Sequence, residues 1–561
     1  MSQNTISREK SYFKEQYKYI VDDLQRKELE QRQKLQRTKE LNMQRRGKHS
    51  QLQQYAVEYS YATDIHGIQF LSERRSLCEK IFWIVVVLLS FITCLVMVTV
   101  ALLTFQNSSV IVSFKARDTP IYEIPFPAVT ICPESKGLSL LFTRLEHTLA
   151  LRGYLNITEE SWLAYQYFHI LCNRKGPPKL FGTRMLGNDF FEIFDRIRKP
   201  LDDIFFRCEL FGRTRNCSEL FVPTLTEEGL CYTFNMLSRE DLFVSNLFNY
   251  KDFYEGKRTY GWAGQHGYLK GVEMHTYPAR ALLSGADNPL RVTLKISKAE
   301  DFLLCRSFTA GYRVLLHNPI DIPRPSQHHF LVPMNKFVAI AVEPKLLGTH
   351  ERVRTMPVFK RLCYMDRERN LRYFKWYSQQ NCFLECLTDF LLAKCQCVHF
   401  SMPRKANTRI CGNNDKTCLD EAQFQLSTLD METQMSAHQS GYCDCKPLCT
   451  DLKFELEMSQ SVWNWQSYYE NQWGNDVEKE RQKLNVSIHE IALLSIYFKS
   501  GHFLSVMRHE WHGVPDLLSK VGGYFSLFTG MSMVSIMELI YFLTIRIICN
   551  KSRYGHWAGP Q

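Results

Sequence analysis

The sequence predicts an α+β protein in which two transmembrane helices flank a large extracellular domain rich in disulfide bonds. Two apolar segments, one near each end of the chain, are long enough to cross a hydrocarbon core of about 30 Å at about 1.5 Å per helical residue. Sixteen of the 19 cysteines lie between these segments, where alternating patterns typical of strands occur beside helical patterns. At 561 residues and 45% hydrophobic composition, the chain can form more than one structural unit.

The first apolar segment, residues 81–105, is predicted to be an uncleaved signal anchor. No charged residue occurs between Lys80 and Lys115, and the N-terminus has no apolar core of the kind that a secretory signal requires. The expected order is a cytoplasmic N-terminal region, a first span, an extracellular domain, a second span with the pore, and a cytoplasmic tail. The corresponding boundaries are 1–80, 81–105, 106–516, 517–545 and 546–561.

The second apolar segment contains residues that a simple lipid anchor does not need. An ionisable group in a span, here Glu538, costs about 3 kcal/mol or more and usually faces a partner or a water-filled path. Small residues let helices approach or let backbone carbonyls face a pore. The small and hydroxyl residues are Gly522, Gly523, Ser526, Thr529, Gly530, Ser532 and Ser535. A pore-lining span is the interpretation, and an ordinary packing face with a snorkelling glutamate is the alternative.

Basic residues lie before the first span and after the second, and the positive-inside rule assigns such flanks to the cytosol. Both termini are therefore expected inside and residues 106–516 outside. These residues are Arg74, Arg75 and Lys80 before the first span, and Arg546, Lys551 and Arg553 after the second. Glycosylation sequons at Asn107, Asn156, Asn216 and Asn485 all lie in the segment assigned to the exterior. The net charge of +11 suits anionic inner-leaflet lipid, and no nucleic-acid motif accompanies it.

Local patterns predict the elements of the extracellular domain. The segments 126–132 (FPAVTIC) and 229–235 (GLCYTFN) are expected to be strands. Alternation over 291–345 predicts an antiparallel sheet, and helix-like runs follow around 371–392. Before the first span, the polar tail 1–55 is expected to be a solvated helix or disordered rather than a coiled coil, because its leucines keep no heptad.

The spacing of four cysteines predicts a disulfide ladder. Cys382 and Cys386 are about 6 Å apart along a helical face, and Cys443 and Cys445 are about 6.6 Å apart along a strand face. A helix against an antiparallel strand would bridge Cys382 to Cys445 and Cys386 to Cys443. The remaining rungs of this hypothesis are Cys363 to Cys449 outside, and Cys395 to Cys418 and Cys397 to Cys411 inside. Zinc binding by these cysteines is disfavoured, because the segment is assigned to an oxidising compartment.

Several motifs, taken in order, resemble the degenerin/epithelial sodium channel family, and more narrowly its insect pickpocket branch. They run through the chain: His66-Gly67, FPAVTIC at 126–132, GLCYTFN at 229–235, GYRVLLHNPIDIP at 311–323, the cysteine-rich block 363–449, and GGYFSLFTGMSMVSIMELIYF at 522–542. Their order and spacing are more specific than any single motif.

The resemblance implies a trimeric, amiloride-sensitive, sodium-permeable channel with a hand-like ectodomain of finger, thumb, palm, knuckle and β-ball. The implied roles are a selectivity filter at Gly530, Met531 and Ser532, pore positions at Ser526, Lys520 and Glu538, and gating positions at His66, Gly67 and Ser519. It also implies the five-rung ladder with Cys132 to Cys231 and Cys208 to Cys217, which leaves Cys172 and Cys305 as a candidate pair. No metal or cofactor is implied, and the permeant ion is Na+.

One position departs from the family pattern. Acid-sensing relatives have an aspartate after the degenerin position, where this chain has Lys520. Lysines around a pore axis would repel cations by about 1 kcal/mol per charge pair near 4 Å in water. Three explanations stay open: the side chain points away, the conductance is low, or the subunit works in a heteromer.

The leading hypothesis is a cation channel subunit of the plasma membrane, gated by an extracellular or mechanical stimulus and assembled as a homo- or heterotrimer. The alternative is a regulatory subunit that does not conduct alone. An enzyme is disfavoured, because the HEWH sequence at 509–512 lacks zincin spacing and no nucleophile elbow or phosphate loop occurs. Histidines in the extracellular domain could sense acid, but each is interpreted as an exposed loop histidine, and acid, peptide, small-molecule and mechanical stimuli all stay open. These histidines are His275, His317, His328 and His329.

Overall fold

The computed structural model describes residues 51–107, 110–136, 153, 170–171, 186–264, 267–272, 275–297, 310–437, 441–471, 489–511, 513–555 and 557. The chain divides into a terminal unit, made of residues 1–108 and 512–561, and a middle unit, residues 109–511. The polar tail 1–50 and the candidate pair Cys172 and Cys305 lie outside the described residues.

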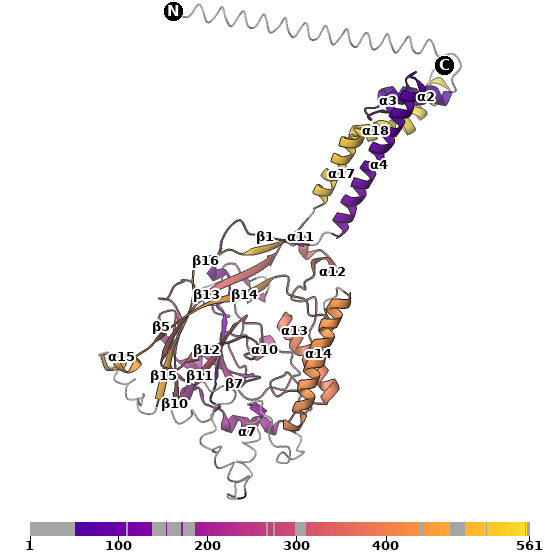
Figure 1. The fold of residues 1–561 in the computed structure, drawn as a ribbon. Helices are drawn as coiled ribbons and strands as arrows, with labels where there is room; N and C mark the ends of the chain where they lie inside the picture. Colours follow the sequence, from indigo (N-terminus) through magenta and orange to yellow (C-terminus); the bar gives the residue numbers. More distant parts are fainter. Residues whose placement is uncertain are drawn as a thin grey trace, which may run out of the picture. The chain divides into compact units, whose positions relative to one another are not determined.

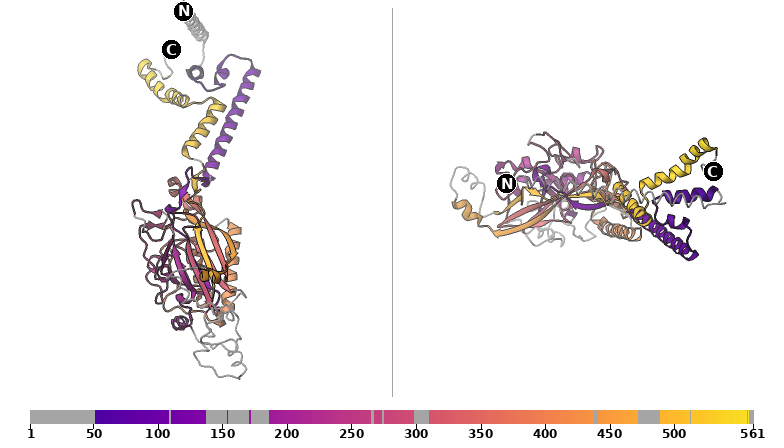
Figure 2. Two further views of the ribbon diagram at one scale, coloured as in Figure 1. Left: turned by 90° about the vertical axis from the view of Figure 1, so that its left-hand side faces the viewer. Right: turned by 90° about the horizontal axis from the view of Figure 1, so that it is seen from above.

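The terminal unit is helical. Its helices are α2 (Gln51–Ala62), α3 (Ile68–Ser72), α4 (Leu77–Asn107), α17 (Val514–Thr529), α18 (Met533–Ile540), the π-helical turn η6 (Tyr541–Ile545) and α19 (Arg546–Tyr554). Helix α17 packs beside α4 (Figures 1 and 2). By length and composition, Leu77–Gln106 and Met533–Tyr554 are long and apolar enough to cross a membrane. The segment predicted as one span, 517–545, is therefore divided among α17, α18 and η6.

The middle unit contains two main sheets. The larger has the order β1-β17-β13-β15-β10-β4-β5, with β14 also paired to β13, and the smaller has the order β12-β11-β3-β7-β6. Their strands are β1 (Val110–Phe114), β3 (Ala128–Pro133), β4 (Phe205–Leu210), β5 (Arg213–Arg215), β6 (Phe221–Thr226), β7 (Gly229–Phe234), β10 (Leu290–Ser297), β11 (Gly311–His317), β12 (Phe330–Pro333), β13 (Lys336–Thr349), β14 (Asp451–Val462), β15 (His489–Phe498) and β17 (Val506–Glu510). Two short pairs join β2 (Thr119–Pro120) to β16 (His502–Phe503) and β8 (Trp262–Ala263) to β9 (Gly267–Tyr268).

Aromatic side chains hold the two sheets together. Phe126 is fully buried, and its ring lies edge-on to Phe234 of the smaller sheet and Phe498 of the larger sheet. Such aromatic pairs add about 0.5 to 1.5 kcal/mol beyond the apolar area they bury. The predicted strands 126–132 and 229–235 appear as β3 and β7, which pair antiparallel.

Helices α13 (Gln379–Cys395) and α14 (Lys416–Ala437) pack together beside these sheets (Figure 1). Ser378 caps α13 by accepting a hydrogen bond from the backbone N–H of Asn381. The predicted helix over 371–392 thus begins later, at Gln379. The shorter helices of this unit are η1 (Ile121–Glu123), α7 (Asp189–Ile197), α8 (Leu201–Ile204), α9 (Cys217–Leu220), α10 (Arg239–Leu242), α11 (Glu351–Arg354), α12 (Val358–Arg361), η5 (Asn413–Asp415) and α15 (Trp465–Asn471).

The antiparallel pairing predicted over 291–345 is confirmed for β10, β11 and β12 and is wrong in part for β13. The segment does form strands, but β11 and β12 belong to the smaller sheet, and β13 runs parallel to β15 and β17. Alternation identifies a strand and its buried face, whereas its neighbours depend on the connections. A parallel pair needs a long crossover, and here α13 and α14 lie between β13 and β15 in the chain.

Seven disulfide bonds join the pairs that were named from the sequence. They are Cys132–Cys231, Cys208–Cys217, Cys363–Cys449, Cys382–Cys445, Cys386–Cys443, Cys395–Cys418 and Cys397–Cys411. The strand expected at 443–445 is wrong, because residues 441–444 form a turn in which Asp444 has a φ of 48°. The Cα atoms of Cys386 and Cys443 nevertheless lie 5.9 Å apart.

Candidate functional site

The terminal helix breaks at Gly530. Helix α17 ends there because Gly530 adopts a left-handed conformation with a φ of 69°, while its N–H donates to the carbonyl of Ser526 at 3.0 Å. Glycine has no Cβ and adopts this conformation without steric cost. Backbone groups at such a break are released from the helical ladder, so they are available to a ligand or an ion.

Ser532 restarts the helix two residues later. Its hydroxyl accepts a hydrogen bond from the N–H of Ser535 at 3.2 Å, and the Ser535 hydroxyl accepts one from the N–H of Ser532 at 3.2 Å. This reciprocal cap fixes the entry of the chain into α18. Ser535 is buried and Ser532 is exposed, so the predicted filter residues 530–532 form a short non-helical link between two capped helices.

His66 lies directly on this link. Its backbone N–H donates to the carbonyl of Thr529, the last residue of α17, at 2.9 Å. Its ring approaches Gly530 so closely that a Cβ there would lie 2.7 to 2.8 Å from three ring carbons. The structure therefore brings together the residues predicted for gating and for the filter.

Gly67 fixes the turn that carries His66. It has a φ of 85°, and a Cβ at this position would lie 2.5 Å from Cγ2 of Val87 in α4. The turn is thus held on one side by α4 and on the other by the end of α17. A side chain at Gly67 would be both strained and obstructed.

Helix α2 contacts the same terminal segment further along. Tyr55 donates its hydroxyl hydrogen to the carbonyl of Phe542 in η6, and the rings of Tyr55 and Tyr59 lie edge-on to the Phe542 ring. Glu58 forms an ion pair with Arg546. Except for Arg546, which was predicted only as a basic flanking residue, no role was predicted for these residues from the sequence. The spacing of Tyr55 and Tyr59 at i and i+4 can be seen in the sequence, but it carries no information about their distant partner Phe542.

The other predicted pore and gating residues lie on the two halves of the broken helix. Ser519, Lys520 and Ser526 are exposed on α17. Glu538 is partly buried on α18, and its Oε2 atom is enclosed without a hydrogen-bond partner among the described residues. Of the predicted glycosylation sites, Asn216 is exposed and caps α9, whereas Asn156 and Asn485 lie outside the described residues. The side chain of Asn107, at the end of α4, is also outside them.

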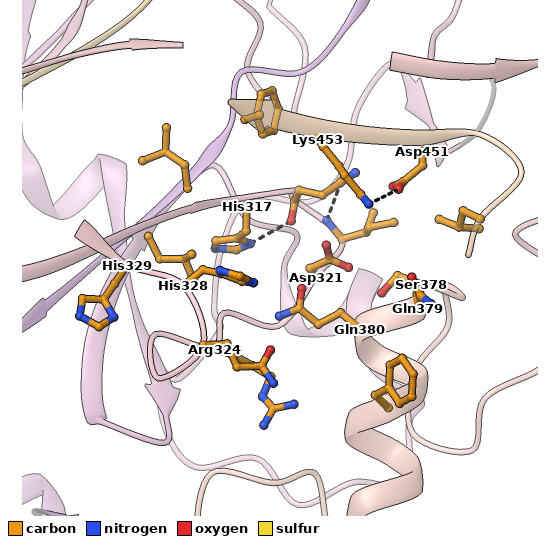
Figure 3. A pocket seen from close by; sticks show the side chains of 18 of the residues that line it. His317, Asp321, Arg324, His328, His329, Ser378, Gln379, Gln380, Asp451 and Lys453 are labelled. Carbon is orange, nitrogen blue, oxygen red and sulfur yellow. Dashed lines mark hydrogen bonds and ion pairs between the residues drawn. The ribbon is translucent and has the colours of Figure 1, made fainter. Parts of the chain in front are cut away.

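A cavity of about 1000 Å³ lies in the middle unit beside the first turn of α13, strand β14 and the end of β11. Figure 3 shows His317, Asp321 and Arg324 around this space, with Lys453 paired to Asp451 at 3.5 Å. Burial raises the pKa of Asp321 to about 7.

His317 is a buried core histidine, so the prediction of an exposed loop position is wrong for it. Its Nε2 atom lies 2.9 Å from the hydroxyl of Thr130, and its Nδ1 atom lies 2.9 Å from the carbonyl of Asn318. Burial lowers the pKa of His317 to about 4. His275, His328 and His329 are exposed, as expected.

A cluster of metal-binding residue types also occurs in the middle unit. Cys397, Cys411 and Asp415 offer ligand atoms within 4.8 Å of one another. However, Cys397 and Cys411 are joined in a disulfide, which removes the thiolates that a zinc site needs.

Comparison with known proteins places the chain among ion channels. The family model described as Amiloride-sensitive sodium channel matches residues 59–542. Pickpocket protein 28 of Drosophila melanogaster is 26% identical over 88% of this chain and 78% of its own length. Sodium channel protein Nach of Drosophila melanogaster is 22% identical over 87% of this chain and 86% of its own. Degenerin mec-10 of Caenorhabditis elegans is 22% identical over 46% of this chain and 34% of its own.

Proposed function

Because the chain belongs to the amiloride-sensitive sodium channel family, it is a channel subunit rather than an enzyme, and we propose that it forms an amiloride-sensitive pathway for Na+ across the plasma membrane. In this proposal both termini are cytoplasmic, and three copies, or this chain with related subunits, surround the pore.

The observation that carries the proposal is the capped break at 530–532 with His66 packed against it. Ion filters use backbone carbonyls and hydroxyls to replace part of the hydration shell of the ion. The break releases such groups from the helical ladder, and Ser532 adds an exposed hydroxyl. We assign the filter to Gly530, Met531 and Ser532, and the gate to the His66-Gly67 turn that holds the filter in place.

Charged residues on either side of the break would tune conduction. Glu538, repeated around a pore axis, would attract cations at the cytosolic side. Lys520 would repel them at the outer side unless its side chain points away from the axis. Lys520 and Met531 therefore support a second candidate, a regulatory subunit that requires partners to conduct.

The stimulus is proposed to act on the middle unit, either as an extracellular solute or as a mechanical force. The cavity beside Asp321 and Lys453 supports a solute, because it is large enough for a small molecule and polar groups line it. The ladder of disulfides supports transmission of force, since cross-linked elements deform little.

Voltage clamp of cells that express this chain alone, with and without amiloride, tests the proposal. We expect an amiloride-sensitive Na+ current, increased when Ser519 is replaced by a bulky residue. Surface expression without any current, including in the Ser519 variant, would overturn the self-sufficient channel and favour the regulatory subunit.

Substitution of the two capping serines tests the filter. Both Ser532→Ala and Ser535→Ala remove one half of the helical cap, but only Ser532 is exposed. We expect Ser532→Ala to change the ratio of Na+ to K+ permeability, and Ser535→Ala to leave this ratio near that of the native chain. Equal ratios in all three proteins would remove Ser532 from the filter.

A further inference from the structure

A second cavity in the middle unit has aromatic walls and acidic groups. Its volume is about 200 Å³, which is small for a drug-sized ligand. Its lining includes residues from five separate segments of the chain: Glu123, Trp262, Asp366, Trp376, Tyr377 and Thr450. We call this space the aromatic cavity.

Two tryptophans in contact with each other form one wall of the aromatic cavity. The ring centroids of Trp262 and Trp376 lie 6.3 Å apart, with their planes at 51°. Tyr377 adds a third ring, held in place because its hydroxyl donates to the carbonyl of Lys446 at 2.5 Å. A cation that lies over this joint aromatic surface can be within about 6 Å of more than one centroid, which is the range of favourable cation–π attraction.

The walls are fixed by close packing. Gly264 follows Trp262 at the tip of the β8–β9 hairpin, and a Cβ there would lie 2.7 Å from the Trp376 ring and 3.3 Å from Oδ2 of Asp366. The glycine thus lets the hairpin touch Trp376 while the Asp366 carboxylate lies beside the same contact. The acidic group and the aromatic wall are therefore adjacent.

Three polar groups of the aromatic cavity have no partner in the part of the chain that the structure describes. Among the described residues, neither the Asp366 carboxylate nor the Glu123 carboxylate makes a hydrogen bond or an ion pair. The Thr450 hydroxyl oxygen is enclosed and also has no partner in that part of the chain. The nearby guanidinium of Arg280 donates to the carbonyls of Tyr122 and Val272 rather than to Glu123.

These features favour one class of ligand. Calcium requires six to eight oxygen ligands, more than two carboxylates and one hydroxyl supply. Aromatic rings beside a carboxylate are suited to an ammonium group that carries alkyl substituents. We propose that the aromatic cavity binds a small organic cation of the alkylammonium or quaternary ammonium class, with Asp366 as its counter-ion and Trp262 and Trp376 as its aromatic wall.

Isothermal titration of the full-length protein in lipid nanodiscs tests the proposal with choline as the probe. Its neutral carbon isostere, 3,3-dimethylbutan-1-ol, has nearly the same shape without the charge. We expect choline to bind at least about tenfold more tightly than the isostere, which corresponds to about 1.4 kcal/mol. Equal binding of the two probes, or no binding of choline, would overturn the proposal.

Variants assign the binding to the cavity. We expect Asp366→Asn and Trp376→Leu each to weaken choline binding by about tenfold, and Trp376→Phe to weaken it less because the ring remains. The matched control is Asp287→Asn, which removes one exposed carboxylate that does not line the cavity. Choline binding that persists in both Asp366→Asn and Trp376→Leu would refute the site, and a monodisperse elution profile checks that each variant is folded.

Titration requires no current, so this inference stands apart from the proposed function. Choline binding in a protein that passes no current would refute the self-sufficient channel alone. A conducting protein that does not bind choline would refute the aromatic cavity alone.

Discussion

At the scale of single residues, Gly530 is constrained both by its backbone conformation and by a neighbouring side chain. It combines a φ of 69° with a ring of His66 that occupies the space of any side chain. Left-handed backbone costs a non-glycine residue about 1 to 2 kcal/mol, and the clash adds to this cost. Conformation and contact therefore both require glycine at the start of the proposed filter.

We expect Gly530→Ala to abolish current or to change ion selectivity, because either His66 or the break must move. The matched control is Gly555→Ala, which has nearly the same φ of 70° but nothing within 4 Å of the new Cβ. Current and surface labelling are measured for both. If Gly555→Ala is equally damaging, backbone strain rather than the His66 contact accounts for the loss.

The pKa of His317 predicts a pH dependence of stability. Its folded-state pKa of about 4 lies below the usual 6.5, so the unfolded chain binds more protons between these values. The free energy of unfolding should therefore fall as the pH decreases from 6.5 to 4, by up to about 1.4 kcal/mol per pH unit. Thermal unfolding of the native protein and of His317→Gln across this pH range checks the prediction. The same dependence of stability on pH in both proteins would contradict it.

Asp321 should act in the opposite direction. Its folded-state pKa of about 7 lies above the usual 3.8, so its contribution is present at low pH and is lost as the pH rises through 7. Asp321→Asn should remove this loss. We expect the variant to gain stability relative to the native protein as the pH rises from 4 to 8, and a constant difference between the two would show that Asp321 is ionised throughout.

At the scale of elements, the helix α13 is attached twice to the segment 443–445, at and just after the turn. The bonds Cys382–Cys445 and Cys386–Cys443 close loops with sequence separations of 63 and 57 residues. In the chain-entropy account a loop of this size stabilises a fold by about 4 kcal/mol, but two nested loops share most of that entropy. One bond should therefore largely substitute for the other.

We expect removal of Cys386–Cys443 by alanine substitution to lower the free energy of unfolding by much less than half of the loss on removal of both bonds. Urea unfolding of the variant that lacks one disulfide and of the variant that lacks both measures the two losses of stability. Substitution of the exposed free cysteines Cys78 and Cys549 is the control. Strictly additive losses would show that the two bonds stabilise the fold independently.

At the scale of the whole molecule, the two ends of the chain meet in the terminal unit. Helix α2 contacts η6 and α19 through Tyr55, Phe542 and the Glu58–Arg546 ion pair. A π-helical turn widens the backbone at Tyr541–Ile545, where the Phe542 carbonyl accepts the Tyr55 hydroxyl. The N-terminal segment therefore holds the second half of the broken helix as well as the break itself.

Reversal of the Glu58–Arg546 pair tests this connection. We expect Glu58→Arg and Arg546→Glu each to alter channel opening, and the double variant to recover it because the attraction is restored. Arg553→Glu makes the same charge change on α19 at a residue with a ring contact to Tyr554. Channel opening is measured by voltage clamp of the four variants. If the double variant does not recover native opening, a direct pairing of residues 58 and 546 is contradicted.

The sequence by itself determined the features that depend on local composition and spacing. Apolar length predicted the first candidate span, whereas the second begins at Met533 rather than at 517. Alternation predicted strands β3, β7, β10, β11 and β13, and family motifs pointed to Gly530–Ser532 and His66. The pairs Cys382–Cys445 and Cys386–Cys443 also followed, because the spacing of Cys382 and Cys386 matches one turn of helix. The pairs Cys132–Cys231 and Cys208–Cys217 came from the family resemblance.

Only the tertiary structure decided which distant segments meet. It placed His66 on Gly530, Tyr55 on Phe542, and Trp262 against Trp376, and it showed that β13 runs parallel to two of its neighbours. The physical reason is that a periodic pattern specifies the buried face of an element, whereas the partner of that face depends on packing between residues far apart in the chain. His317 shows the same limit, since its burial follows from strands β3 and β7 rather than from its own neighbours.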